Sequence, residues 1–379
     1  MSASSPLSLA FIIELKQRAL RCHANLTVML LLILFNPWKT GKIDRWRNNM
    51  LKTIEIRYFK SIELLEIDCK RINVLIGEPN TGKSNILEAI GVFSLPYCDK
   101  LREIVRIENM SDLFFEKEIK NKVSVRTGLS DYIISYEEGR VKIDLNYEKE
   151  ITINYVTDDK GQKRRSPKSH SHVPIKFYKF KTLEKYKLLD TTFLVPLYGE
   201  NLLSLIKSNK ELQELCSSIF QPLGYKLWLR PHEGKIDIVK NLNEKKESSM
   251  EVVVSHPYTL ISDTFQRLVF YLAAVETNSN SVLIFEEPEV KSFPFYSKFL
   301  AESIAFDQNQ NQYFLSTHNP YFLLSLLEKS KINDIGVFIT YTENYKTRVR
   351  ELTEEERSEI LEYGIDVFFN ILRYIEDKE

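Results

Sequence analysis

Apolar and polar residues alternate in short blocks from residue 50 onward, and these blocks predict alternating strands and helices. Strand-like patterns, some alternating and some continuously apolar, cover residues 54–58, 62–67, 72–76, 281–285 and 312–315. Helical spacing of apolar side chains covers residues 85–93, 265–275 and 295–305. Strand, turn and helix repeated in this way predict an α/β fold with a mostly parallel sheet and flanking helices.

The middle of the chain has a different pattern. Residues 123–155 alternate in the manner of strands and contain a turn signal at Glu138-Gly139, which predicts an antiparallel β region. Residues 202–220 have the spacing of a helical region. Residues 158–172 are polar, basic and without periodicity, and we expect an exposed loop there.

Composition and charge narrow the class of protein. The chain has 379 residues, of which 43% are hydrophobic, and its formal net charge is zero. A zero net charge excludes a uniformly basic surface for nucleic acid. The four cysteines have no metal-ligand spacing, which predicts reduced thiols and a cytoplasmic protein.

The first 49 residues do not belong to this pattern. Residues 26–35 are strongly apolar, but this run is about half of the roughly 20 residues that span a bilayer. No small-residue cleavage site follows it. We expect residues 1–49 to be an extension of doubtful function, Met50 to be the functional start, and no stable membrane association.

The clearest chemical signal lies at residues 77–84, which fit the pattern G-x-x-x-x-G-K-[ST] between a strand and a helix. In this loop backbone N–H groups point at phosphate oxygens, Lys83 can reach the β- and γ-phosphates, and Ser84 can ligate Mg²⁺. The sequence therefore predicts a P-loop NTPase with ATP and Mg²⁺ as cofactors. The predicted binding residues are Gly77, Glu78, Pro79, Asn80, Thr81, Gly82, Lys83, Ser84 and Asn85.

Two acidic residues, Glu286 and Glu287, end the apolar run 282–285. The carboxyl ends of parallel strands are where such a sheet presents its ligands. Glu286 can hold Mg²⁺, and Glu287 can polarise the attacking water. The alternative is an acidic turn after a core strand, and the phosphate loop elsewhere in the chain favours the chemical interpretation.

Two further positions have both a chemical and a purely structural interpretation. His318 follows the strand at 312–315, where it can contact the γ-phosphate, although a single histidine in a turn is often incidental. Ser262 is suited to cap the helix that follows it. Its functional alternative is contact with ATP held by a second subunit.

These four elements, in this order, resemble the ABC-type ATPase head of the RecF, SMC and OLD group, most closely a stand-alone branch related to OLD proteins. The stretches that carry the resemblance are GEPNTGKSN, LISDTFQR, LIFEEPE and STHNPYFL, and it covers residues 50–327. It implies that Glu287 is the catalytic base, Glu286 the metal-side acid, His318 the switch histidine and Ser262 the signature serine, which acts on the other protomer's ATP.

The resemblance also implies partners. Such heads dimerise head to tail around two ATP molecules, which implies a homodimer in the ATP state. Related heads serve in DNA repair or antiphage defence beside a separate effector protein. One departure concerns the signature, because Thr264 and Phe265 stand where a small residue is usual, and we expect their bulk to weaken approach to the γ-phosphate.

The leading hypothesis is an ATP-hydrolysing molecular switch. The alternatives are an inactive nucleotide-binding scaffold, and a DNA-binding module with slow hydrolysis that uses Lys160, Lys163, Arg164, Arg165 and Lys168. The expected organisation is an extension (1–49), an ATPase head in two parts (50–98 and 258–330) around an inserted region (99–257), and a C-terminal segment (331–379).

Deletion of residues 1–49 is expected to leave a protein that binds ATP. The segment carries none of the predicted chemistry, and the strand pattern begins after it. The nucleotide affinity of the purified truncation, compared with that of the full chain, checks this. Loss of binding in a truncation that circular dichroism shows to be folded would place the segment within the ATP-binding core.

Overall fold

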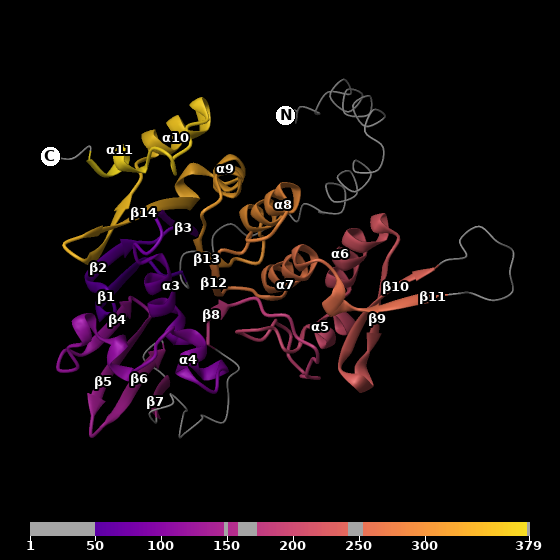
Figure 1. Ribbon diagram of the computed structural model, residues 1–379, viewed down its shortest axis with the longest axis horizontal. Coiled ribbons are helices and arrows are strands. Elements are labelled where there is room, and N and C mark those ends of the chain that lie inside the picture. The colour runs from indigo at the N-terminus through magenta and orange to yellow at the C-terminus, as the bar shows by residue number, and fades with distance from the viewer. Residues whose placement is uncertain (1–49, 148–150, 158–172, 242–252, 377–379) are drawn as a thin grey trace, which may run out of the picture.

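The computed structural model describes residues 50–147, 151–157, 173–241 and 253–376 (Figure 1). Two segments interpreted above, the extension at 1–49 and the basic stretch at 158–172, lie outside the described residues. Within the described part of the chain, no helix is long and apolar enough to cross a bilayer.

The central sheet has six strands in the order β15-β14-β3-β13-β12-β8. The first five in chain order run parallel, and the last is an antiparallel edge strand. Their bounds are β3 (Ile72–Gly77), β8 (Ile175–Tyr178), β12 (Val282–Glu286), β13 (Gln312–Ser316), β14 (Ile335–Glu343) and β15 (Lys346–Glu351). This mostly parallel sheet confirms the predicted α/β class.

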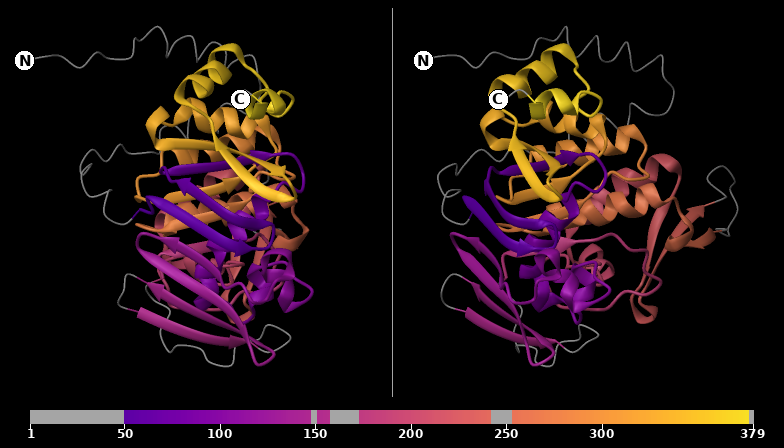
Figure 2. Two further views of the ribbon diagram at one scale, coloured as in Figure 1. Left: turned by 90° about the vertical axis from the view of Figure 1, so that its left-hand side faces the viewer. Right: turned by 60° about the vertical axis from the view of Figure 1, so that its left-hand side comes forward.

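A second sheet of six strands is wholly antiparallel and has the order β2-β1-β4-β5-β6-β7. Its strands are β1 (Thr53–Phe59), β2 (Ile62–Asp68), β4 (Val123–Thr127), β5 (Ser130–Glu137), β6 (Arg140–Tyr147) and β7 (Ile151–Thr157). In Figure 2 these strands, coloured indigo to magenta, lie on the side of the central sheet away from α8 and α9. The predicted antiparallel region is therefore confirmed.

The strands of the central sheet are apolar along their whole length because they separate two cores. In β3, Ile72, Val74 and Ile76 face the core built with the long helices, whereas Leu75 faces the core shared with the antiparallel sheet. All six residues of this strand are buried. The phosphate loop therefore begins from a strand that is fixed on both faces.

More helices cover one face of the central sheet than the other. The helix α3 (Lys83–Gly91) packs between the two six-stranded sheets, and its apolar residues belong to the second core. The other face carries α7 (Asp263–Thr277), α8 (Pro294–Ala305), α9 (Pro320–Lys329) and α10 (Glu354–Tyr363). Two shorter helices, α4 (Leu101–Ile104) and α11 (Ile371–Glu376), lie near the second sheet and the C-terminus, respectively (Figure 1).

A third, small sheet lies at the end of the molecule opposite to the antiparallel sheet (Figure 1). It consists of β9 (Lys226–Arg230), β10 (Lys235–Asn241) and β11 (Val253–Pro257), and packs against α5 (Leu202–Ser208) and α6 (Lys210–Phe220). The helical region predicted at 202–220 is thus two helices. They divide at Asn209, whose side-chain oxygen accepts a hydrogen bond from the Leu212 N–H at 2.7 Å and caps α6.

Three strands of the central sheet lie outside the two ranges predicted for the ATPase head. β8 lies within the range 99–257 and pairs with β12, whereas β14 and β15 lie within the range 331–379, where β14 pairs with β3 and β15 with β14. None of the three strands was predicted from its pattern. The sheet that carries the phosphate loop is therefore built from segments spread over almost the whole described chain.

Candidate functional site

The phosphate loop, residues 77–84, connects β3 to α3 and lies against the hairpin of β14 and β15. Its two glycines have left-handed backbone angles, with φ +150° at Gly77 and φ +102° at Gly82. A Cβ atom on Gly77 would lie 2.3 Å from the Thr340 carbonyl oxygen, and one on Gly82 would lie 2.1 Å from Thr347 Oγ1. Glycine is therefore required twice, for the turn and for the close approach of the hairpin.

Hydroxyl and amide groups fix the shape of this loop. Thr81 Oγ1 donates a hydrogen bond to the Glu78 carbonyl at 2.8 Å and lies 2.7 Å from Thr340 Oγ1. Asn85, on the first turn of α3, donates from Nδ2 to Ser61 Oγ at 2.7 Å. The tip of the loop, Glu78 to Asn80, is exposed, so the loop has a rigid base and an open tip.

Lys83 lies across the inside of the loop. Its ammonium group donates to the carbonyl oxygens of Gly77 at 2.9 Å and Glu78 at 2.7 Å, and the residue is only 5% exposed. Burial lowers the pKa of this lysine to about 8, whereas the carboxylates of Glu287 and Glu78 favour its charged form. A positive charge therefore points into the concave side of the loop.

The acidic pair follows β12 at the carboxyl edge of the central sheet. Glu286 is in register with Ser316 of β13, and Ser316 with Leu75 of β3. Glu287 has φ +44°, and its N–H lies 3.1 Å from the Ser316 carbonyl oxygen and 3.2 Å from Ser316 Oγ. The backbone thus turns sharply between the two carboxylates and sends them in different directions.

His318 follows β13 and meets Glu287, with 3.6 Å between His318 Nε2 and Glu287 Oε1. Both side chains are a little more than one-third exposed. Burial and the charge of Lys83 lower the pKa of His318, and the carboxylate of Glu287 opposes them. The structure therefore brings Lys83, Glu287 and His318 together, although they are far apart in the sequence.

A buried carboxylate that the sequence reasoning left without a role connects the turns carrying Glu287 and His318. Glu289 is 3% exposed, and the Thr317 hydroxyl donates a hydrogen bond to its Oε1. Thr317 Oγ1 in turn accepts from the Asn319 N–H at 2.9 Å. Burial raises the pKa of Glu289 to about 7. In the sequence, only its position two residues after Glu287 and next to a proline indicates that Glu289 belongs to the site.

Glu286 is paired with an arginine that the sequence reasoning also missed. Arg106 Nη2 lies 3.0 Å from Glu286 Oε1, and Arg106 Nε lies 2.8 Å from Glu88 Oε1. The other oxygen of Glu88 lies 2.5 Å from Lys60 Nζ. A chain of alternating charges therefore extends from α3 to the end of β12, and no short-range pattern in the sequence marks it.

The predicted magnesium ligands fit a divalent cation. Ser84 lies on the first turn of α3, Glu286 lies at the carboxyl edge of the sheet, and Glu286 already accepts a cationic guanidinium. Within the described residues, no group of three or more His, Cys, Asp and Glu could hold a metal ion. Mg²⁺ commonly takes one or two protein ligands and completes its shell with phosphate oxygens and water, so two ligands are sufficient.

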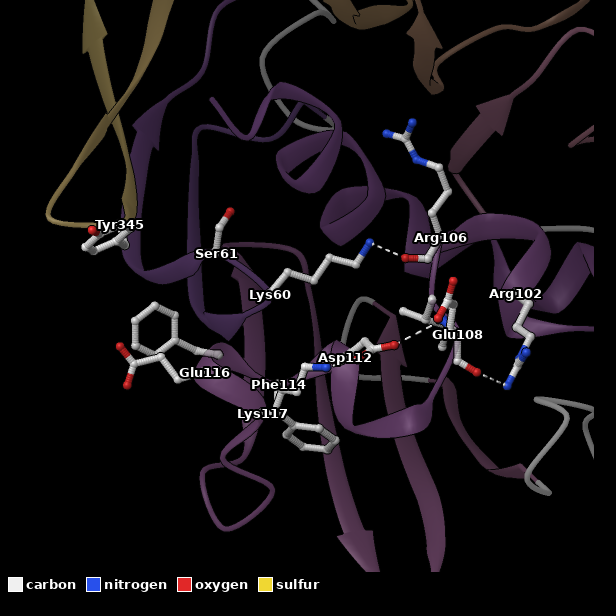
Figure 3. A pocket seen from close by; sticks show the side chains of 12 residues that line it. Lys60, Ser61, Arg102, Arg106, Glu108, Asp112, Phe114, Glu116, Lys117 and Tyr345 are labelled. Atoms are coloured by element: carbon white, nitrogen blue, oxygen red, sulfur yellow. Dashed lines mark hydrogen bonds and ion pairs between the residues drawn. The ribbon is translucent and has the colours of Figure 1, made fainter. Parts of the chain in front are cut away.

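An open cavity of about 780 Å³ lies beside the turn that follows β1. Figure 3 shows Tyr345 on one side of it and Arg102 and Arg106 on the other, with Lys60 and Ser61 between them. Ser61, which accepts the hydrogen bond from Asn85, joins this cavity to the first turn of α3. Its remaining lining residues are Ile107, Glu108, Asp112, Phe114, Phe115, Glu116 and Lys117.

Ser262 is exposed and begins α7, where its Oγ accepts a hydrogen bond from the Thr264 N–H at 3.3 Å. The predicted helix cap is confirmed. Among the described residues, no hydrogen bond or ion pair joins Ser262 to the phosphate loop of its own chain. Phe265 packs into an aromatic cluster, with ring centroids 5.9 Å from Phe220 and 5.1 Å from Tyr296.

Comparisons with known proteins give limited similarity. No family model matches the chain. A DNA replication and repair protein RecF from Exiguobacterium sp. is 33% identical over 101 residues, which are 26% of this chain and 26% of that protein. The chain therefore aligns with about a quarter of the length of this relative.

Three solved SMC head structures are similar in part. A head bound to the C-terminal winged-helix domain of ScpA is 15% identical (TM-score 0.47), with 82% of this chain and 99% of that chain covered. The Thermotoga maritima head is 14% identical with a TM-score of 0.40, and the match covers 80% of this chain and 99% of that chain. A Pyrococcus furiosus head bound to the C-terminal domain of ScpA is 12% identical with a TM-score of 0.44, and the match covers 83% of this chain and 99% of that chain. At these values activity and partners have to be inferred from the site itself.

Proposed function

We propose that this protein binds ATP with Mg²⁺, hydrolyses it, and uses the cycle as a molecular switch. The observation that carries the proposal is the meeting of Lys83, Glu287 and His318 at one edge of the central sheet. A cation for phosphate and a carboxylate for water are groups that phosphoryl transfer to water uses, and the imidazole beside the carboxylate adds a further polar contact.

The phosphates would be held by the loop and by the N-terminus of α3. The backbone N–H groups between Gly77 and Asn85, of which Pro79 has none, and the helix dipole favour negative charge there. The Lys83 ammonium, which now bonds to two loop carbonyls, is in position to bind phosphate oxygens. Loop residues Glu78, Pro79, Asn80, Thr81 and Gly82 shape this cradle.

We assign the metal to Ser84 and Glu286. Mg²⁺, when bound, would neutralise charge that develops on the phosphate oxygens. Glu287, the next residue, then acts as the general base that orients and deprotonates water. The hydrogen bond between Thr317 and Glu289 connects the turn that carries His318 to the turn that carries Glu287 and fixes their separation.

Burial and the charge of Lys83 lower the pKa of His318, which favours the neutral imidazole over the charged form. A neutral imidazole donates a hydrogen bond from one ring nitrogen and accepts with the other. The γ-phosphate oxygens and the Glu287 carboxylate both only accept, so donation to the phosphate would replace donation to Glu287, and His318 would thereby report the presence of that phosphate. The base and ribose would occupy the cavity beside the turn after β1, which Asn85 at the start of α3 reaches through its hydrogen bond to Ser61.

The switch itself would be a homodimer closed around ATP, as in the heads that the sequence resembles. Ser262 is exposed at the N-terminus of α7, as a contact with a second subunit requires. Phe265 supports this reading, because its ring packs inward against Phe220 and Tyr296 instead of over the helix terminus. A separate effector protein, in DNA repair or antiphage defence, would bind the closed, ATP-bound dimer.

Replacement of Lys83 by alanine should lower nucleotide affinity by about ten- to a hundredfold, the range for lost hydrogen bonds from a charged group. Equilibrium binding of a fluorescent ATP analogue measures this. Lys210→Ala, on the exposed surface of α6, is the matched control and should bind as wild type does. Unchanged affinity in a folded Lys83→Ala protein would contradict the phosphate-loop assignment.

Glu287→Gln should retain ATP binding and slow hydrolysis by about 10²- to 10⁴-fold, because the amide keeps the shape and loses the basicity. Single-turnover phosphate release and nucleotide binding are measured on the same preparation. Glu328→Gln, at an exposed position of α9, is the control. If phosphate release by Glu287→Gln matches wild type, the base lies elsewhere, and Glu286 and His318 become the residues to test.

The trans role of Ser262 can be tested with heterodimers that carry two lesions. With Lys83→Ala on one subunit and Ser262→Arg on the other, both lesions fall in one composite site, and the second site is intact. With both on the same subunit, each site has one lesion. The first arrangement should retain about half of the wild-type hydrolysis, and the second much less, if the two sites fire independently.

The control for that experiment is a heterodimer with Lys83→Ala alone on one subunit, which shows whether a single intact site turns over. Equal rates from the two arrangements, with that control active, would contradict the trans contact. Ser262 would then be only the cap of α7.

A further inference from the structure

The guanidinium of Arg106 joins two carboxylates on different elements. Its Nη2 lies 3.0 Å from Glu286 Oε1 at the end of β12, and its Nε lies 2.8 Å from Glu88 Oε1 on α3. The backbone N–H of Arg106 adds a 3.3 Å contact to the same oxygen of Glu88. Arg106 thus connects the acid assigned to the metal with the helix that carries the phosphate loop.

We propose that Arg106 is a built-in counter-ion for Glu286, which Mg²⁺ replaces when the nucleotide binds. This inference rests on the proposed function, because it concerns regulation of the same site. It assigns a positioning role to a residue outside all the sequence motifs. Without nucleotide, the arginine keeps the metal-side acid paired, and the ion pair is exchanged as the metal arrives.

The surroundings of Glu88 make this exchange feasible. Glu88 is fully buried, and a buried carboxylate that loses its only cation would be strongly unfavourable. Lys60 lies 2.5 Å from its second oxygen and also donates to the Arg106 carbonyl at 2.7 Å. Glu88 therefore stays paired, and the backbone at residue 106 stays anchored, when the guanidinium turns away from Glu286.

The exposure of the Arg106 and Glu286 side chains is also consistent with an arginine that can leave the glutamate. The side chain of Arg106 is 63% exposed and that of Glu286 is 21% exposed, so the pair lies at the surface of the site. An ion pair of this exposure is weak enough to be exchanged. Arg106 also lines the open cavity of Figure 3, where its guanidinium points away from Lys60 and Ser61 instead of packing between them.

The charge of the acidic pair gives a reason for such a counter-ion. Glu286 and Glu287 are adjacent, and two carboxylates without nearby cations repel each other. Lys83 lies near Glu287, whereas Arg106 is in contact with Glu286. The pKa of Arg106 is raised: burial opposes its charge, but the carboxylates of Glu286, Glu88 and Glu287 outweigh burial.

The test is the Mg²⁺ dependence of nucleotide binding in Arg106→Ala. A fluorescent, non-hydrolysable ATP analogue is titrated onto the full chain in EDTA and at a series of Mg²⁺ concentrations. Arg106→Ala should increase the ratio of affinity with Mg²⁺ to affinity without it by about three- to tenfold, because the competing cation is gone. Arg106→Lys should lie between it and wild type, since lysine keeps the charge and cannot bridge both carboxylates.

The matched control is Arg126→Ala. Arg126 is 64% exposed and also forms an ion pair, but with Glu55 in the antiparallel sheet. In Arg126→Ala the ratio of affinity with Mg²⁺ to affinity without it should equal that of wild type. A double-mutant cycle with Glu286→Gln separates this role from a structural one, since Arg106→Ala should leave the ratio unchanged once Glu286 has no charge.

Three outcomes would overturn the proposal. If folded Arg106→Ala binds the analogue as wild type does both with and without Mg²⁺, the ion pair is inert. An equal loss of affinity with and without Mg²⁺ shows that Arg106 is only a phosphate ligand. A wild-type chain that binds no nucleotide refutes the proposed function itself, and the inference fails with it. The first two results leave nucleotide binding by wild type intact, so the two failures are distinguishable.

Discussion

The parallel pairing of β3, β13 and β12 is the constraint on which the site depends. Leu75, Ser316 and Glu286 lie side by side in this pairing, and the turns that follow carry the phosphate loop, His318 and Glu287. The three strands are apolar on both faces because they separate two cores. A slip of one residue in any strand would move its side chains to the wrong face, so the register of the site is fixed by packing.

The local part of this arrangement was predictable from the sequence. Continuous apolar runs identified β3, β12 and β13, and the polar residues after each run identified the loop, the acidic pair and His318. The antiparallel region was also predicted, including the turn at Glu138-Gly139. These features depend on neighbours within a few residues, and hydrophobic patterns and turn residues record such neighbours well.

The parts that were missed depend on distant partners. β8 is only four residues long, and β14 lies beyond the last recognised motif, so each is defined by the strand it pairs with. The ion pair of Arg106 and Glu286 joins residues 180 positions apart, and Glu88 lies within the predicted helix at 85–93 without any motif around it. Glu289 belonged to a recognised motif, but its role became visible only through its contact with Thr317.

The balance of charge links Arg106, which the sequence did not reveal, to the residues of the phosphate loop and the acidic pair. Glu286 and Glu287 contribute two negative charges at the edge of the sheet, and Lys83 and Arg106 contribute two positive charges beside them. The cluster is therefore close to neutral before a nucleotide enters, which is what a partly buried group of charges requires for stability. Lys83 is fixed within the loop, whereas Arg106 is exposed and held through Glu88. A nucleotide with its metal brings both negative and positive charge, and the exposed arginine is the member of the cluster that can move to restore the balance.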